Sequence, residues 1–186
     1  MKKIKLKPGL LWITGLSGAG KTTISKIIYK KLKKKYSNII LLDGDQLRNK
    51  FNIPYIKVSG SFSNTYRTKV GLKYVEECKK YVNNKGKFVI IAAMALISRV
   101  QNEYRKIKNN FDVYLDVSIS ELERRDAKGL YKKFRNKEIK NMSGLDLKFD
   151  KPKNPNLYLK WKKNFTAYKM SKKILLLINN DSKTIE

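Results

Sequence analysis

Residues 15–22, GLSGAGKT, have the types and spacing needed to hold a chain of phosphates. Glycines let the backbone curl so that successive N–H groups point at phosphate oxygens. In the pattern G-x-x-x-x-G-K-[ST], the lysine (Lys21) reaches the outer phosphates, and the hydroxyl of Thr22 is a ligand for Mg²⁺. The loop and its neighbours are therefore predicted to bind ATP through Gly15, Ser17, Gly18, Ala19, Gly20, Lys21, Thr22 and Thr23.

The segments on either side of this loop are the ones that the motif requires. LLWIT, at residues 10–14, is typical of a buried strand, and apolar residues recur at helical spacing over 21–36. Bound phosphates would then meet a helix N-terminus, where the dipole and the unpaired amides favour anions. A chance glycine-rich turn is the alternative, and it does not account for the strand before and the helix after.

Strands and helices alternate along the rest of the chain. Further strands are predicted from apolar runs at 38–43, 88–94, 111–117 and 173–179. Helical stretches are predicted at about 65–84, 98–109, 119–127 and 157–170. This alternation predicts an α/β fold with a doubly wound, mostly parallel sheet, in a single domain over residues 1–186. Ligands of such sheets bind beyond the carboxyl ends of the strands, where the glycine-rich loop, the DGD of 43–45 and the residues after AAM (92–94) fall.

Residues 128–156 differ from the rest because they are basic, contain two prolines and have little apolar periodicity. A long excursion of this type in a compact domain is usually functional, and here it predicts a lid over the bound ligands. We expect this lid to be mobile without ligand, since little besides ligand charge would hold it closed. A disordered surface loop is the alternative.

The net charge of +28 invites a different interpretation, a nucleic-acid-binding protein. Seven of the 43 basic residues are arginines and the rest are lysines spread along the whole chain, which indicates a composition bias. Motifs of the zinc-finger, RRM or KH type are absent from the sequence. We therefore expect no specific nucleic-acid partner, although a general positive field attracts anionic nucleotides.

The residue types that are scarce limit the chemistry and suggest the compartment. Cys78 is the only cysteine, which rules out an intrachain disulfide, and the absence of histidine leaves a carboxylate or water as the general base. The N-terminus superficially resembles a signal peptide, but the phosphate-binding loop uses the same residues. No apolar run approaches membrane-spanning length, so we expect a cytoplasmic protein without membrane contact.

Four motifs occur in an order that resembles the adenylylsulfate kinase family: GLSGAGKTT, LDGDQLR, FSNTYR and RDAKGLYKKFRNKEIKNMSGLD. Members of this family use ATP to phosphorylate the 3′-hydroxyl of adenosine 5′-phosphosulfate. The resemblance covers roughly residues 9–178. Its most specific part is the last block, which polynucleotide kinases, shikimate kinases and small GTPases lack.

The resemblance implies a role for each carboxylate of the DGD motif. Asp45 corresponds to the residue that faces the acceptor hydroxyl and accepts its proton, and it is the catalytic candidate together with Lys21. Asp43 is the metal-side candidate together with Thr22, because the strand ending in AAM lacks the aspartate found there in many P-loop proteins. A simple turn after a strand is the alternative for this motif.

The resemblance also implies binding residues and an assembly. Arg48 and Arg67 match arginines that hold the anionic part of the acceptor, and Phe62 matches an aromatic on its base, with core packing as the alternative. The remaining matches are Arg99 near the acceptor, Arg125 near ATP, and Lys128, Gly129, Leu130 and Lys140 in the lid. A homodimer is implied as well.

Departures from the family pattern lie on the acceptor side only. Val70 and Leu72 stand where the family has an asparagine and an arginine, and the usual ISPYR has become LISR. The segment 49–61 is longer than usual and offers Tyr55, Lys57 and Ser59 to the pocket. The sequence therefore leaves two candidates for the acceptor. One is adenylyl sulfate, and the other is a different nucleotide, such as the cytidine diphosphoramidate used by relatives in capsule modification.

Overall fold

A five-stranded parallel sheet forms the centre of the computed structural model, which describes residues 4–53 and 63–180. The strands are β1 (Gly9–Gly15), β2 (Ile39–Asp43), β3 (Phe88–Ala92), β4 (Asn110–Asp116) and β5 (Leu157–Lys160). Their order is β2-β3-β1-β4-β5, and each neighbouring pair is parallel. The predicted α/β fold with a doubly wound parallel sheet is confirmed.

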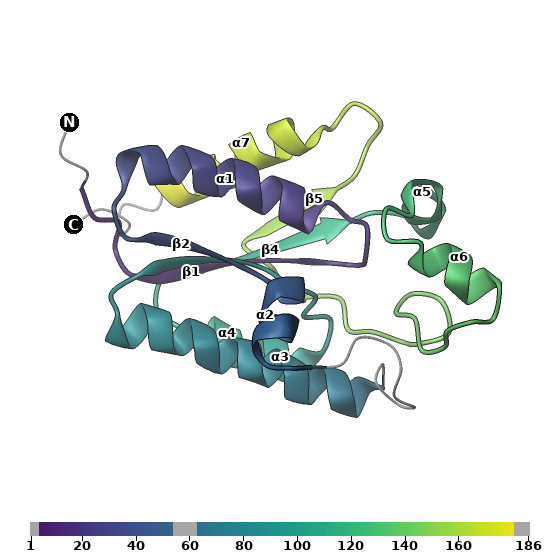
Figure 1. Ribbon diagram of the computed structural model, residues 1–186. Helices are drawn as coiled ribbons and strands as arrows, with labels where there is room; N and C mark the ends of the chain where they lie inside the picture. The colour runs from purple at the N-terminus through teal and green to yellow at the C-terminus, as the bar shows by residue number, and fades with distance from the viewer. Residues whose placement is uncertain (1–3, 54–62, 181–186) are drawn as a thin grey trace.

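Helices cover both faces of the sheet (Figure 1). One face carries α1 (Lys21–Lys35) and α7 (Ala167–Asn180), and the other carries α3 (Asn64–Lys79) and α4 (Ser98–Arg105). A π-helical turn, η1 (Lys80–Asn84), continues α3. Three short helices lie towards the carboxyl ends of the strands: α2 (Gly44–Lys50), α5 (Ile119–Arg125) and α6 (Leu130–Arg135).

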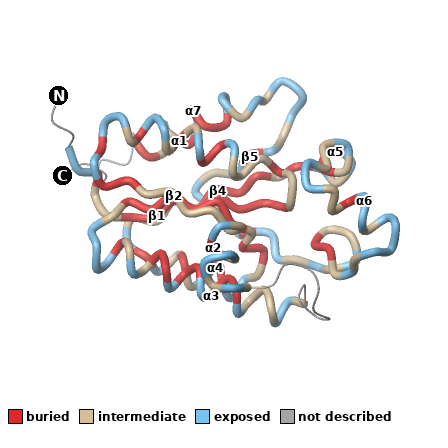
Figure 2. Tube along the Cα trace, viewed as in Figure 1, coloured by how far each residue is buried: buried red, intermediate tan, exposed pale blue. Residues whose placement is uncertain are grey.

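Strands β1, β3 and β4 in the middle of the sheet are the most deeply buried part of the molecule (Figure 2). Every residue of β1 is buried, as expected for a central parallel strand covered on both faces. Leu11 and Ile13 belong to the core under α1 and α7, whereas Leu10 and Trp12 belong to the core under α3 and α4. The alternation of side chains along β1 therefore ties the two helical layers to one rigid strand that ends at the phosphate-binding loop.

Near the C-terminus two sequence predictions are wrong. Residues 173–179 form part of helix α7 instead of a strand, and 157–160, expected to begin a helix, form strand β5. Met170, Ile174 and Ile178 are buried at intervals of four residues, while Leu176 is 57% exposed. The run of apolar letters suggested a strand, but the side chains that face α1 follow a helical period. In β5, conversely, Leu159 is buried between exposed Tyr158 and Lys160, the alternation of an edge strand.

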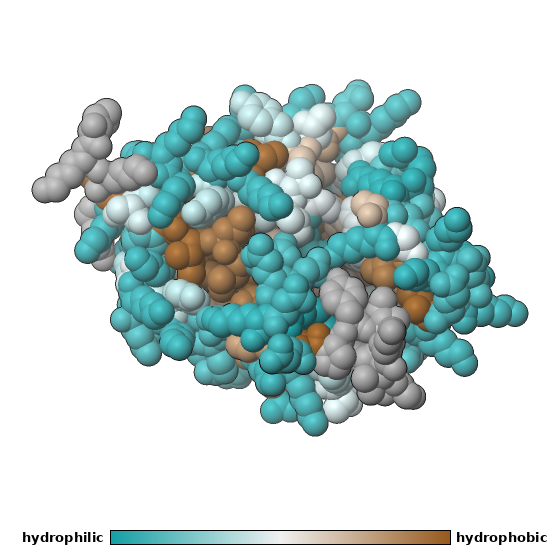
Figure 3. Space-filling view, viewed as in Figure 1, coloured by the Kyte–Doolittle hydropathy of each residue, from teal (hydrophilic) through white to brown (hydrophobic). Residues whose placement is uncertain are grey.

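Hydrophilic side chains cover most of the molecular face seen in Figure 3. On α1 the exposed lysines include Lys30, Lys31, Lys34 and Lys35. Among the helices of residues 4–53 and 63–180, none is both long and apolar enough to cross a membrane.

Candidate active site

The phosphate-binding loop connects β1 to α1 as predicted. Gly20 lies directly before α1 with φ of 93°, a left-handed conformation that glycine adopts without strain. No side chain of the described residues caps the first turn of α1. The amides of this turn therefore remain available to an anion at the positive end of a 15-residue helix.

Lys21, the first residue of α1, folds back over the loop. Its Nζ donates hydrogen bonds to the carbonyl oxygens of Gly15 (3.0 Å) and Leu16 (2.9 Å). Burial and the neighbouring Lys128 lower the pKa of Lys21 to about 8, against the opposing effect of Asp45 and Asp43. A polyphosphate bound at the loop would add negative charge beside this ammonium and raise its pKa again.

Thr22 and Asp43 form a pair of hard oxygen ligands. The Oγ1 of Thr22 donates to Oδ2 of Asp43 at 2.7 Å, and Oδ1 of Asp43 accepts from the backbone N–H of Asp45 at 2.9 Å. The second bond caps helix α2 and fixes the orientation of the Asp43 carboxylate. A hydroxyl and a carboxylate beside a phosphate-binding loop fit Mg²⁺, which prefers oxygen ligands and is held by few protein groups.

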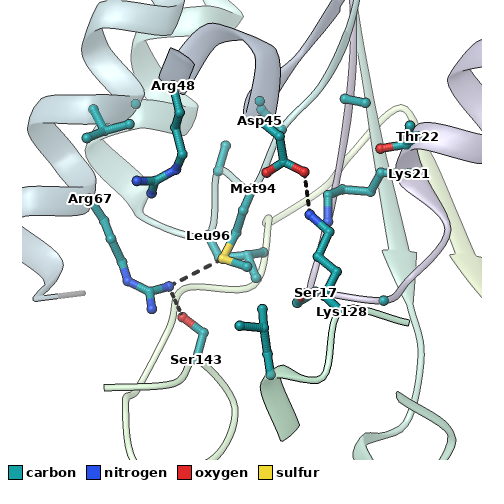
Figure 4. A pocket seen from close by; sticks show the side chains of 18 of the residues that line it. Ser17, Lys21, Thr22, Asp45, Arg48, Arg67, Met94, Leu96, Lys128 and Ser143 are labelled. Carbon is teal, nitrogen blue, oxygen red and sulfur yellow. Dashed lines mark hydrogen bonds and ion pairs between the residues drawn. The ribbon is translucent and has the colours of Figure 1, made fainter. Parts of the chain in front are cut away.

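Asp45 lies at the start of α2 and lines a cavity of about 330 Å³. The turn that carries it is held by the hydroxyl of Tyr74, which donates to the carbonyl oxygen of Gly44 at 2.9 Å. Across the cavity, the Nζ of Lys128 forms an ion pair with the Asp45 carboxylate, and Lys21 lies beside both (Figure 4). At this point of the cavity the Asp45 carboxylate thus lies with two ammonium groups next to the phosphate-binding loop.

Arg48 and Arg67 extend into the cavity from α2 and α3 (Figure 4). The guanidinium of Arg67 donates to Oγ of Ser143 (2.5 Å), the carbonyl oxygen of Asn141 (2.7 Å) and the sulfur of Met94 (3.4 Å). Burial and the positive charge of Arg48 lower the pKa of Arg67 to about 10. Because the two guanidinium groups repel each other, an anion bound at this end of the cavity would stabilise both.

The structure does not bring every predicted acceptor residue to the cavity. Val70 lines it, but Leu72 does not, and Arg99 is exposed in the first turn of α4 and away from the lining. Phe62 lies outside the described residues, as do Tyr55, Lys57 and Ser59.

Lys128, Leu130 and Lys140 of the predicted lid line the cavity, and Gly129 takes the left-handed conformation that begins α6. The segment is held by more than charge. Tyr131 is buried and its hydroxyl donates to the carbonyl oxygen of Ser17 at 3.1 Å, and Met142 and Ser143 are buried too. The expectation that little besides ligand charge holds the lid closed is therefore wrong for these parts of the segment.

Arg125 lies against the phosphate-binding loop from α5. Its Nη1 donates to the carbonyl oxygen of Gly18 at 3.4 Å, and its guanidinium stacks 5.0 Å from the ring centre of Trp161. Of the remaining loop residues, Ser17, Gly18 and Thr23 line the cavity, and Ala19 is buried in the hydrophobic core.

Several cavity residues were missed from the sequence. Met94 and Leu96 follow strand β3 and form an apolar part of the lining (Figure 4). Their position at the end of AAM (Met94) and just after it (Leu96) was a usable signal, because ligands of parallel sheets bind there. Ser143 was missed because the segment around it has no periodicity to show which side chains point inwards.

A parallel sheet with a phosphate-binding loop, a lysine, a carboxylate pair and a basic lid around one cavity defines a P-loop kinase. A family model described as adenylylsulphate kinase matches residues 7–160. The chain belongs to the adenylylsulphate kinase family. It is accordingly an ATP-using phosphotransferase that acts on a hydroxyl group.

Individual relatives differ in the acceptor that their names state. Cytidine diphosphoramidate kinase from Campylobacter jejuni is 40% identical over 150 residues, which cover 80% of this chain and 84% of that protein. Adenylyl-sulfate kinase from Clostridium acetobutylicum is 37% identical over 158 residues, covering 84% and 76% respectively. Among solved structures, the Mycobacterium tuberculosis APS kinase CysC in complex with AMPPNP and APS has a TM-score of 0.81 at 28% identity, covering 94% of this chain and 99% of that one.

Proposed function

We propose that this protein transfers the γ-phosphoryl group of ATP to the ribose 3′-hydroxyl of a small anionic nucleotide. The observation that carries the proposal is the position of Asp45, which lines the same cavity as the phosphate-binding Lys21 and the arginines Arg48 and Arg67. This arrangement offers one end of the cavity to the phosphates of ATP and the other to an anionic acceptor. The acceptor hydroxyl would then lie between them, at the Asp45 carboxylate.

In the proposed step the acceptor oxygen attacks the γ-phosphorus, and the bond from that phosphorus to the β,γ-bridging oxygen breaks. The bridging oxygen leaves with the bond electrons on ADP, and the hydroxyl proton passes to Asp45. Lys21 and Lys128 offset the charge on the transferring group, and the amides of the loop hold the phosphates in line. Asp45 supplies the proton acceptor that a chain without histidine needs.

Thr22 and Asp43 would hold Mg²⁺, directly or through water. When bound, this ion neutralises charge on the β- and γ-phosphate oxygens. The Thr22–Asp43 hydrogen bond and the Asp43 cap on α2 keep both ligands oriented beside the loop.

The ion pair between Lys128 of the lid and Asp45 affects when the carboxylate is available to the acceptor. While Lys128 pairs with Asp45, it competes with an acceptor hydroxyl for the carboxylate. The γ-phosphoryl group of ATP attracts Lys128 more strongly because it carries more negative charge. We propose that ATP draws this lysine away and makes Asp45 available as the base.

Two acceptors are compatible with the site. Adenosine 5′-phosphosulfate is the acceptor implied by the family, and it would place the protein in sulfate activation. Cytidine diphosphoramidate is the second candidate, supported by the 40% identical relative and by Val70, an apolar residue on the acceptor side of the cavity. A cytoplasmic location and a homodimer remain part of the proposal.

The test is an ADP-release assay with ATP, Mg²⁺ and three kinds of acceptor: adenosine 5′-phosphosulfate, cytidine diphosphoramidate and plain nucleoside phosphates. We expect ADP release only with a nucleotide that bears the additional group, the sulfate or the phosphoramidate, and none with plain nucleoside phosphates. The Asp45→Asn variant should lose about 10²–10⁴-fold in kcat because it keeps the shape but not the proton acceptor. Glu76→Gln, the same change at an exposed carboxylate of α3, is the control and should keep full activity. Near-normal turnover by Asp45→Asn would show that the base is elsewhere.

A further inference from the structure

Residues 141–147, here called the Asp146 loop, form a closed turn within the lid. The Asp146 carboxylate accepts hydrogen bonds from the backbone N–H groups of Asn141 (2.8 Å) and Met142 (2.6 Å). The N–H of Gly144 donates to the carbonyl oxygen of Leu147 at 3.1 Å, and the N–H of Leu147 to that of Met142 at 3.2 Å. The turn is therefore closed by its own side chain and backbone.

The Asp146 loop packs against the phosphate-binding loop on one side. Gly144 has φ of 89°, and a Cβ at this position would lie 2.9 Å from Ile119 and 3.1 Å from Leu16. Glycine is thus needed both for the left-handed backbone and for the close approach. Met142, also buried, belongs to the same hydrophobic cluster as Leu16 and anchors the same turn.

On its other side the Asp146 loop holds Arg67. Ser143 is only 5% exposed, and its Oγ accepts from one terminal nitrogen of Arg67, while the carbonyl oxygen of Asn141 accepts from the other. Figure 4 shows Ser143 and Arg67 facing each other across the end of the cavity where Arg48 lies. The loop therefore connects the ATP half of the site, at Leu16, with the acceptor half, at Arg67.

We propose that the Asp146 loop is a fixed wall of the acceptor pocket and that Ser143 is the positioning residue that orients Arg67 towards the acceptor anion. An arginine fork binds an anion through paired bonds only in a narrow range of orientations, so holding it in advance lowers the cost of binding. The proximity of Asp146 supports the same assignment, because its charge favours the protonated guanidinium. This inference rests on the proposed function, since it assigns the anion to the acceptor.

Hydrogen exchange of the free protein tests the wall without any substrate. We expect slow exchange at the amides of Met142, Gly144 and Leu147, and faster exchange at these amides in Ser143→Ala and Arg67→Lys. Ser171→Ala is the matched control, because Ser171 is also buried and its hydroxyl also forms one hydrogen bond, as a donor to the carbonyl oxygen of Tyr168, but it lies on α7. Fast exchange of the Asp146 loop in the parent protein would overturn the proposal.

Steady-state kinetics separate positioning from a general structural role. Ser143→Ala should raise the KM of the acceptor about tenfold, the loss expected for one hydrogen bond to a charged group, and leave the KM of ATP unchanged. Ser143→Thr, which keeps the hydroxyl, should restore the parent value. In an Arg67→Lys background the Ser143→Ala change should have no further effect on the acceptor KM, because the fork it orients is gone.

The outcomes distinguish this inference from the function on which it rests. Turnover in which Ser143→Ala leaves the acceptor KM within about twofold, or raises both KM values equally, contradicts the positioning role of Ser143. If Ser143→Ala does not fold, Asp146→Asn must raise the acceptor KM selectively, since it weakens the bonds that close the loop. Absence of turnover by the parent protein with every acceptor contradicts the proposed function, while the exchange experiment still decides whether the wall is fixed.

Discussion

At the scale of single residues, the site depends on charges that are incompletely balanced before ligands bind. Lys21 illustrates this, because burial and Lys128 hold its pKa near 8, well below the usual value for lysine. Burial and the charge of Arg48 lower the pKa of Arg67 in the same way. A bound anion stabilises the charged form of both groups, and this stabilisation favours the binding of polyanionic substrates.

Binding of ATP should therefore take up a proton at alkaline pH. Above pH 8 Lys21 of the free protein is largely neutral, and phosphates at the loop raise its pKa, so the complex binds one more proton than the free protein. The ATP dissociation constant should rise with pH from about 8, approaching tenfold per pH unit.

Calorimetry at pH 8.5 in two buffers with different ionisation enthalpies measures this uptake. Lys21→Arg is the control, because a guanidinium does not titrate in this range. Equal binding enthalpies in the two buffers for the parent protein would contradict the lowered pKa.

At the scale of elements, the sequence predicted the parts that contact ATP better than the parts that surround the acceptor. The strand–loop–helix of 10–36 has a local cause, since glycine positions and apolar periodicity specify it together. Strand β5 and helix α7 were mispredicted because their identity depends on tertiary packing against β4 and α1. Ser143 was missed for a related reason, as its contact with Arg67 joins residues 76 positions apart.

The helical assignment of 173–179 can be tested by stability. Ile174→Ala should lower the free energy of unfolding by about 2–5 kcal/mol, because Ile174 is fully buried against the sheet and α1. Leu176→Ala should change it by less than about 0.5 kcal/mol, because that side chain is mostly exposed. In a strand the two residues would share one face, so equal losses in urea unfolding would contradict the helix.

The lid prediction from the sequence now applies to a shorter segment. Lys132, Lys133 and the run 135–138 are exposed, whereas Tyr131 and the Asp146 loop are anchored. We expect the amides of 132–140 to exchange quickly in the free protein and to slow when ATP and an acceptor are both bound, because their lysines then meet phosphate charge. Slow exchange there in the free protein, unchanged by nucleotides, would show that this segment is no lid.

At the scale of the whole molecule, the net charge of +28 produces a positive field around a site for two anionic substrates. Such a field raises the rate of encounter and is screened by salt. The value of kcat/KM for either substrate should therefore fall severalfold between about 50 and about 300 mM KCl, with kcat little changed. A kcat/KM that is independent of KCl concentration would mean that the lysines do not steer substrates.

The most direct test of the central claim is the position of the new phosphate on the product. Phosphorus–proton correlation NMR on the product of the accepted nucleotide reports which ribose carbon carries it. The account predicts a correlation to the 3′ proton, with one ADP released for each product formed. A phosphate joined to the terminal anionic group of the acceptor, or ADP and inorganic phosphate with no phosphorylated acceptor, would contradict the account.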